Sequence, residues 1–200
     1  TLDIKIPNMI IQPYAENSII HGILPKHEHG NLYIRFKKQN EQTLLIIIED
    51  DGSGMTEKEV RYEYLFIANS RTSRKGDKTP AKNRRVKGKK GIGKFAGLSV
   101  GSHMCLETYA RGTLTKLQID KTHLLDSKQD LEKVDLPVAT SPCKTDIKGT
   151  KIIISNLNQN YVFPNPEKLS EILVREYGRE DGIAIFVNGK KIDVADVKGT

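Results

Sequence analysis

Hydrophobic and polar residues alternate along several short stretches of the chain, as they do in strands with one buried face. This pattern predicts strands at residues 1–6, 31–37, 104–110, 113–120, 149–154 and 183–187. The unbroken apolar run Leu44–Ile48 predicts a strand that is buried on both faces. Apolar residues at helical spacing predict helices at residues 10–23, 56–67 and 166–177.

Breaks in these patterns predict how the chain is divided. Pro13 lies inside the first helix and is expected to kink or restart it. Residues 68–90 have no periodicity, which in a compact domain is typical of a lid or binding loop. Residues 121–148 are polar and irregular and are interpreted as an insertion, and residues 158–200 as a C-terminal helix and hairpin. We expect one domain over residues 1–200, and a strand pattern already under way at residue 1 indicates a piece of a longer protein.

Composition and charge narrow the class of protein. With 37% hydrophobic residues among 200, the chain can fill one core. It has no apolar run of about 18–20 residues, so we expect no membrane insertion in this segment and a cytoplasmic location. The net charge of +7 is concentrated between Arg71 and Lys94, where eleven Lys and Arg residues accompany one acid, Asp77. This distribution favours a local contact with a polyanion, or a solvated loop, over binding of nucleic acid by the whole surface.

A glycine-rich motif follows this basic segment. The stretch Gly88–Gly101 has the form G-x-x-G-x-G and runs directly into a helical pattern of small residues. Glycines allow the backbone to approach a ligand closely, and a helix N-terminus presents unpaired N–H groups to an anion. The motif therefore indicates a phosphate site or, alternatively, a tightly packed loop.

A second candidate site lies at the end of the buried strand 44–48. The sequence Asp50-Asp51-Gly52-Ser53-Gly54-Met55 places acids at the end of an apolar strand, where charge is costly without a partner. An Asp there can accept a hydrogen bond from an exocyclic amine, and the glycines allow a flat ring to lie against the backbone. An ordinary acidic turn is the alternative.

Taken in order, these motifs resemble the GHKL superfamily. The series comprises a helix with Asn17, the D-x-G-x-G motif, a long basic segment, the glycine motif and a Gly-Thr strand at Gly149. It is similar to the Bergerat ATP-binding fold of gyrase B, large heat-shock chaperones, MutL, MORC proteins and sensor histidine kinases, over most of residues 4–157. The resemblance implies an α+β fold, a two-layer α/β sandwich in which helices cover one face of a mixed, mostly antiparallel sheet.

The resemblance also implies roles for single residues. Asn17 is similar to the family's Mg²⁺-binding asparagine, Asp50 to its adenine-reading aspartate, and Thr150 to the threonine that supports this aspartate through a shared water. Gly52 and Gly54 would leave room for the base. The implied ATP-binding set is Asn17, Asp50, Gly52, Gly54, Met55, Gly88, Lys90, Gly91, Ile92, Gly93, Lys94, Phe95 and Thr150.

Two parts of the chain resemble different branches of the superfamily. The helix containing Gln12-Pro13-Tyr14-Ala15-Glu16-Asn17 is similar to LytS-like sensor kinases, and the glycine motif to MORC and chaperone-type ATPases. In those ATPases a Glu four residues before the Asn is the general base, and here that position is Pro13. Glu16 is the remaining candidate for a catalytic base, but it faces about 100° away from Asn17.

The expected function is Mg²⁺-dependent ATP binding with slow hydrolysis, in which residues 68–90 close over the nucleotide and drive a conformational or dimerisation switch. One alternative is the catalytic domain of a sensor histidine kinase, which would transfer the γ-phosphate to a His in a phosphoacceptor domain outside this chain. Another is a module that binds nucleic acid through its basic loop under the control of ATP.

Overall fold

The computed structural model of the chain describes residues 4–38, 44–65, 93–126, 136–157, 161–162, 165–178 and 180–193. The predicted lid at 68–90 lies outside these residues, and so do Gly88, Lys90, Gly91 and Ile92 of the proposed ATP-binding set. Within the described ranges, no helix is both long and apolar enough to cross a membrane.

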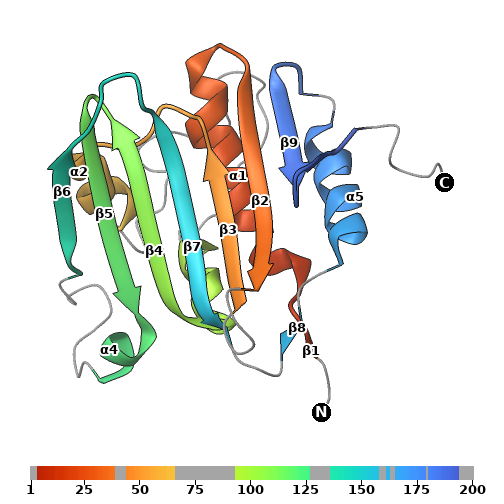
Figure 1. Cartoon of the computed structure of the whole chain (residues 1–200), viewed down its shortest axis with the longest axis horizontal. Helices are drawn as coiled ribbons and strands as arrows, with labels where there is room; N and C mark the ends of the chain where they lie inside the picture. Colours follow the sequence, from red (N-terminus) through yellow and green to blue (C-terminus); the bar gives the residue numbers. More distant parts are fainter. Residues whose placement is uncertain are drawn as a thin grey trace, which may run out of the picture.

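An eight-stranded sheet forms the centre of the molecule (Figure 1). Its spatial order is β10 (Lys190–Lys191), β9 (Ile183–Val187), β2 (Gly30–Lys38), β3 (Leu44–Asp50), β7 (Gly149–Leu157), β4 (Gly101–Ala110), β5 (Thr113–Asp120) and β6 (Val138–Pro142). Only the pair β2–β9 is parallel in this sheet, and the other neighbouring strands are antiparallel. A separate parallel pair joins β1 (Ile4–Lys5) to β8 (Tyr161–Val162).

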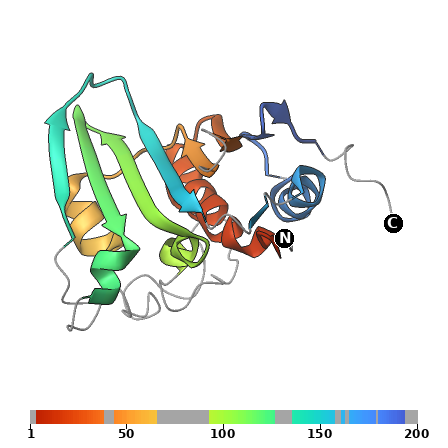
Figure 2. The same cartoon turned by 60° about the horizontal axis from the view of Figure 1, so that its bottom comes forward.

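Helices α1, α2 and α5 lie on one face of this sheet (Figures 1 and 2). The helical segments are η1 (Asn8–Ile10), α1 (Gln12–Asn17), η2 (Ser18–Ile23), η3 (Leu24–Lys26), α2 (Glu57–Glu59), η4 (Val60–Tyr64), η5 (Gly93–Ser99), α4 (Lys121–Asp126) and α5 (Pro166–Tyr177). Here η1, η3 and η5 are 3-10 helices, and η2 and η4 are π-helical continuations of α1 and α2. The predicted α+β fold, with a mostly antiparallel sheet covered on one face, is confirmed.

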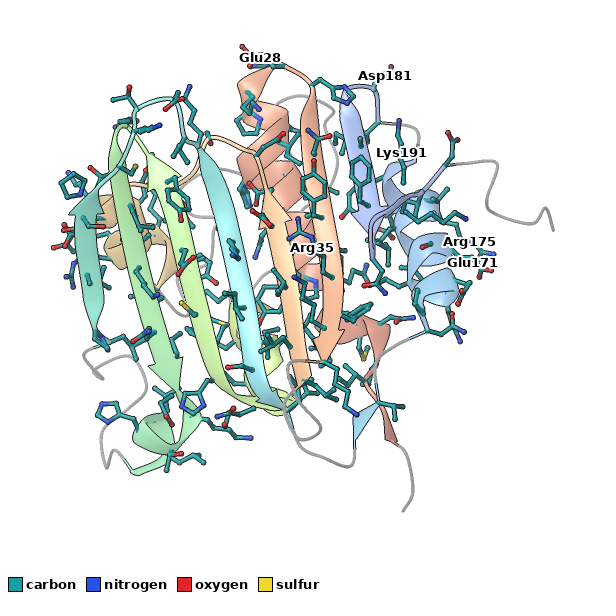
Figure 3. The ribbon with its side chains drawn as sticks, viewed as in Figure 1. Glu28, Arg35, Glu171, Arg175, Asp181 and Lys191 are labelled. Carbon is teal, nitrogen blue, oxygen red and sulfur yellow. The ribbon has the colours of Figure 1, made fainter. Side chains whose placement is uncertain are left out.

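Alternation along the strands places the core between the sheet and its helices. Ile46 and Ile48 of β3 are fully buried there, and Ile47, on the opposite face, is still only 7% exposed. The predicted burial of both faces therefore holds at the centre of this strand, while Leu44 and Leu45 are half-buried. The opposite face of the sheet carries no helix among the described residues, and there Arg35 lies in front of the sheet and bonds Glu49 at 2.6 Å (Figure 3).

Local sequence signals explain where two helices begin. Pro13 lies in the first turn of α1, so the predicted restart of the helix is confirmed. Thr56 and Glu59 form a reciprocal capping box at α2, in which the Thr56 hydroxyl accepts from the Glu59 N–H and the Glu59 carboxylate accepts from the Thr56 N–H.

Part of the segment 121–148, predicted to be irregular, forms regular elements. The structure places helix α4 and strand β6 there, so the prediction of irregular structure is wrong for these residues. Four of the five residues of β6 are exposed, because it is the outermost strand. A strand without a buried face has no hydrophobic alternation, which explains why the pattern did not reveal it.

Candidate nucleotide-binding site

Asp50 is the last residue of β3 and lies on the helix-covered face of the sheet. It shares that face with Ile46 and Ile48, which alternate with it along the strand. In the sheet it is opposite Leu32 on one side and Thr150 on the other. Its side chain is buried, with 4% of the residue exposed. A carboxylate thus stands at the edge of an apolar core, as the sequence predicted.

The surroundings of Asp50 oppose and stabilise its charge at the same time. Burial raises the pKa of its carboxyl to about 6, and the nearby charge of Asp51 acts in the same direction. Hydrogen bonds from the Ser18 side chain and from the backbones of Gly52 and Thr150 favour the ionised form. The Gly52 N–H lies 3.0 Å from the Asp50 carboxylate. Desolvation prevails over these donors, so the pKa of the carboxyl stays above its ordinary value of 3.8.

Two glycines bring the first helix into direct contact with the Asp50 turn. A Cβ on Gly52 would lie 2.4 Å from the backbone of Gly22, and a Cβ on Gly22 would lie 2.8 Å from the Asp50 carboxylate. The Ser53 N–H also donates to the Gly22 carbonyl at 3.0 Å. Helix and turn therefore approach so closely that a side chain at Gly52 would require the backbone to move, and one at Gly22 would require the Asp50 carboxylate to shift.

Gly54 meets the opposite side of the site. Its φ of +67° is a conformation that favours glycine, and an added Cβ would lie 1.9 Å from the Tyr109 carbonyl oxygen. The Cβ directions of Gly52 and Gly54 thus meet the protein's own backbone, so packing alone already requires glycine at both positions.

A pair of threonines extends the site across the sheet. Thr150 is opposite both Asp50 on β3 and Thr108 on β4, and the two threonine hydroxyls are 3.1 Å apart. The fully buried Thr108 hydroxyl also accepts from the Met55 N–H at 2.8 Å. Met55 itself is partly buried against the core. Thr108 therefore anchors the segment after Asp50.

The sequence analysis missed Ser18, Gly22 and Thr108. Ser18 follows the predicted Asn17, and Gly22 one turn later carried a signal as a glycine within a helix. Nothing in the sequence marks Thr108, because threonine is common in strands and only the strand register brings it opposite Thr150.

Asn17 ends α1 directly before Ser18, at the transition to η2. Its side chain is half-buried. The neighbouring Glu16 accepts a hydrogen bond from the Gln12 amide at 3.1 Å. Pro13 is directed toward the glycine motif, with its Cβ 3.0 Å from the position that a Cβ on Gly93 would take.

The described end of the glycine motif, η5, lies against α1. The Gly97 N–H donates to the Tyr14 hydroxyl at 2.7 Å, and this hydroxyl in turn faces the Met104 sulfur at 3.5 Å. A Cβ on Gly97 would overlap Ile154 and the Tyr14 hydroxyl. Tyr14 is fully buried, and its burial raises the pKa of its phenol to about 12. The neutral hydroxyl is thus a fixed acceptor for the η5 backbone.

Lys94 is buried within the same segment. Its ammonium donates to the Tyr64 carbonyl at the end of η4 and lies over the rings of Tyr64 and Phe95, 5.6 and 5.5 Å from their centroids. Burial lowers the pKa of this amine to about 8. Lys94 therefore joins η5 to η4, in addition to the phosphate contact that the sequence predicts for it.

The adjacent acid, Asp51, points away from Asp50. Its carboxylate accepts from the backbone and side-chain N–H groups of Asn31, and the Lys26 ammonium donates to its carbonyl at 2.9 Å. It borders an open hollow of about 540 Å³ lined by Lys26, Glu28, Asp51, Thr145, Asp146 and Lys148. Asp51 fixes the loop before β2, and Asp50 remains the carboxylate of the buried site.

Comparison with known families bears directly on this arrangement. Residues 27–150 match the family described as histidine kinase-, DNA gyrase B- and HSP90-like ATPases, a match over more than half of the chain. The chain belongs to this family. It carries a GHKL-type ATP-binding domain, and the resemblance predicted from the motifs is confirmed. Members of this GHKL ATPase family typically bind ATP with Mg²⁺.

Solved structures agree on the fold of this GHKL domain. The ATPase region of Saccharomyces cerevisiae topoisomerase II bound to ICRF-187 (dexrazoxane) matches with a TM-score of 0.60 and 13% identity, over 94% of this chain and 49% of that one. The topoisomerase IV ATP-binding domain of Francisella tularensis, in complex with a small-molecule inhibitor, matches with a TM-score of 0.54 and 15% identity. This match covers 98% of this chain and 90% of that one. At these identities, the likeness shows the fold alone.

A curated relative shares a shorter stretch. The Bacillus subtilis (strain 168) protein YwpD is 37% identical over 60 residues, which are 30% of this chain and 22% of that protein. The GHKL domain described here thus spans about a fifth of the length of YwpD in this match and about half of the yeast topoisomerase chain.

Proposed function

We propose that this domain binds Mg-ATP with the adenine amine on Asp50 and the metal ion at Asn17. The observation that carries the proposal is the buried carboxylate of Asp50, held between the glycine backbones of the helix and the turn. An ionised carboxylate offers roughly four acceptor positions. The described residues supply donors from Ser18, Gly52 and Thr150, so an acceptor position remains for an exocyclic amine.

The side chain of Asn17 suits a magnesium ion that is shared with phosphates. Its amide oxygen is a hard ligand, and Mg²⁺ is commonly bound by one or two protein oxygens together with substrate phosphates and water. Asn17 lies one residue from Ser18, whose side chain bonds Asp50, so metal and base would be held by one helix. Bound ATP would supply the phosphoanhydride whose cleavage resets the domain.

The glycine motif would hold the phosphates. In this proposal the backbone N–H groups of residues 92–95 donate to phosphate oxygens, with Lys90 and Lys94 adding charge. Residues 68–90 would close over the nucleotide, and binding would drive a conformational or dimerisation switch. Hydrolysis would be slow, because Pro13 occupies the position of the general base in the ATPase branch and Glu16 is engaged by Gln12.

Equilibrium binding of labelled ATP to the Asp50→Asn variant tests the pocket. Loss of a hydrogen bond to a buried charge costs about 1.5–3 kcal/mol, so the affinity should fall by roughly tenfold to a hundredfold. Asp146→Asn is the matched control. Asp146 is exposed in the loop between β6 and β7, so this substitution should leave the affinity for ATP unchanged. An unchanged affinity of Asp50→Asn would refute the assignment.

Transfer of the γ-phosphate to a histidine outside this chain is the second candidate function. Pro13 favours it, because phosphotransfer to histidine needs no base that activates water. Incubation with γ-labelled ATP separates the two candidates. Release of free phosphate by the domain alone supports an ATPase, whereas no release together with labelling of an added phosphoacceptor domain supports a kinase.

A further inference from the structure

Strand β6 forms an exposed edge of the central sheet. Among the described residues no strand lies beyond it, and its positions 139–142 are all exposed. Its sequence, Val-Ala-Thr-Ser-Pro, contains no charged residue. Sheet edges usually carry charges, bulges or covering segments that prevent pairing with another chain. Here Pro142, at the very end of the strand, is the only such feature on β6 itself.

The position of Pro142 determines which backbone groups of β6 face outward. Pro142 is opposite Thr113 and has no N–H, so this must be a pair without mutual hydrogen bonds. The bond from the Cys143 N–H to the Gly112 carbonyl at 2.9 Å agrees with this register. Because the two kinds of pair alternate, Ser141 and Ala139 bond β5.

The backbone groups of the alternate residues Val138, Thr140 and Pro142 therefore point away from the sheet. One of these groups is already occupied. The Val138 carbonyl accepts a hydrogen bond from the Arg61 guanidinium at 3.3 Å, and Arg61 is held by Glu57 at 2.8 Å. Within the part of the chain that the structure describes, the Val138 N–H, both groups of Thr140 and the Pro142 carbonyl have no partner at this outer edge.

We propose that this edge pairs antiparallel with β6 of a second copy of the chain, about a two-fold axis at Thr140. The two Thr140 residues would then exchange both their N–H···O bonds. The Val138 N–H would donate to the carbonyl of the partner's Pro142, and the reciprocal bond would form on the other side of the axis. Self-complementary pairing of this kind is what a two-fold interface requires.

In this arrangement, the carbonyl that is already occupied lies opposite the residue that has no N–H. The Val138 carbonyl, bonded by Arg61, would face the partner's Pro142, which brings no N–H to it. An ordinary strand at that position would bring an N–H toward an acceptor that is already engaged. The edge therefore fits a copy of itself better than an arbitrary extended peptide.

The side chains of β6 do not oppose this pairing. Ala139 and Ser141 are small, and the two Thr140 side chains would form a cross-strand pair of a kind that stabilises sheets. Pairing would join the sheets of two copies into one. In the sheet, β7, β4 and β5 lie between this interface and β3, the strand that carries Asp50. Formation of the interface therefore does not depend on the proposed ATP binding.

Sedimentation velocity of the 200-residue chain over a range of concentrations tests the proposal. The wild type should dimerise, and Thr140→Pro should be monomeric, because it removes from each copy the N–H that makes one of the two central bonds. At concentrations at which the wild type is also monomeric, the thermal midpoints of the two proteins should differ little, since this N–H makes no bond to β5. Thr140→Val is the matched control, which keeps the N–H and should still dimerise. A monomeric wild type, or a dimer that survives Thr140→Pro, would overturn the pairing.

A disulfide test keeps the proposal falsifiable if the proline variant fails to fold. In a background with Cys105→Ser and Cys143→Ser, Thr140→Cys should oxidise to a covalent dimer, because hydrogen-bonded partners lie about 5.5 Å apart at Cα, within the range of a disulfide. Lys168→Cys, exposed on α5, is the control for random collision. Equal crosslinking of the two variants would overturn the register.

Discussion

At the scale of single residues, the proposed contact between Asp50 and adenine predicts that ATP binding depends on pH. Burial raises the pKa of its carboxyl from 3.8 to about 6. An adenine amine donates to the ionised form, so the affinity for ATP should decrease as the pH falls through about 6. Calorimetric titration of wild type and Asp50→Asn across this range measures the effect. The variant cannot titrate at this position and so corrects for protonation of ATP itself; identical profiles would contradict the prediction.

The same raised pKa of Asp50 predicts that the stability of the fold changes with pH in the opposite direction to the affinity for ATP. The folded state binds this proton more tightly than the unfolded chain, so protonation of Asp50 stabilises the fold. The contribution is fully present below about 3.8 and is lost as the pH rises through about 6. Relative to Asp50→Asn, the free energy of unfolding of the wild type should rise on acidification by an amount on the order of 2–3 kcal/mol.

Urea denaturation at several pH values checks this sign. The comparison uses the difference between the two proteins, which removes the titration of every other group that they share. A difference that stays constant with pH would mean that Asp50 has a similar pKa in the folded and unfolded states.

At the scale of elements, one hydroxyl connects α1 to η5. Tyr14→Phe keeps the buried ring but leaves the Gly97 N–H without its acceptor, which costs about 1–3 kcal/mol. Because η5 carries proposed phosphate donors, ATP affinity should fall severalfold beyond any loss of stability. Binding measured well below the thermal midpoint separates the two effects. Tyr33→Phe, on the face of the sheet opposite to α1, is the control, and an equal affinity for both variants would contradict the coupling.

A second contact between elements joins η2 to the Asp50 turn. Gly22→Ala would place a methyl group 2.8 Å from the Asp50 carboxylate, and this carboxylate can rotate away. Gly52→Ala would place its methyl group 2.4 Å from the Gly22 backbone, which cannot rotate away. Both variants should be destabilised by at least about 1 kcal/mol, and Gly52→Ala more than Gly22→Ala. Thermal denaturation ranks them. The reverse order would show that the turn moves more easily than the carboxylate.

The elements also show how far sequence patterns reach. Strands 113–120 and 183–187 and helix 166–177 have the predicted bounds, because each has a buried face that imposes its period on the sequence. Strand β6 was missed because it has no such face. At the site, Asp50 was predictable from its place after an apolar run. The partners Thr108 and Ser18 were not, because strand register and helix packing decide which side chains meet.

Lys94 illustrates the same limit for charge. In the sequence it is one of several lysines near a glycine motif, and nothing there separates a phosphate contact from a structural cation. The structure places its ammonium on the Tyr64 carbonyl, in surroundings that lower its pKa to about 8. This burial and the contact with Tyr64 are properties of the folded chain, which the sequence does not reveal.

At the scale of the whole molecule, the core continues beyond the family match at residues 27–150. Tyr14 and Ile19 from the first helix, and Leu169 and Leu173 from α5, belong to one cluster with the strands. Strand β9, which follows α5, completes the sheet in parallel with β2. The C-terminal segment is therefore expected to fold together with the nucleotide site.

This expectation can be tested at Leu173, which is fully buried on α5. Leu173→Ala should lower the free energy of unfolding by about 2–5 kcal/mol, because it leaves a cavity in the shared core. Leu125→Ala is the control, since Leu125 is 73% exposed on α4 and its truncation should cost little. Urea unfolding is followed by circular dichroism for the whole fold and by ATP binding for the site.

If the core is a single cooperative unit, both signals in Leu173→Ala should shift together to a lower urea concentration, with an unchanged slope. The reason is that the cavity lies between α5 and the sheet that also positions Asp50. A circular dichroism transition that shifts while ATP binding persists to the wild-type urea concentration would contradict this. It would mean that α5 and β9 unfold separately and that the site depends only on the strands and helices that surround Asp50.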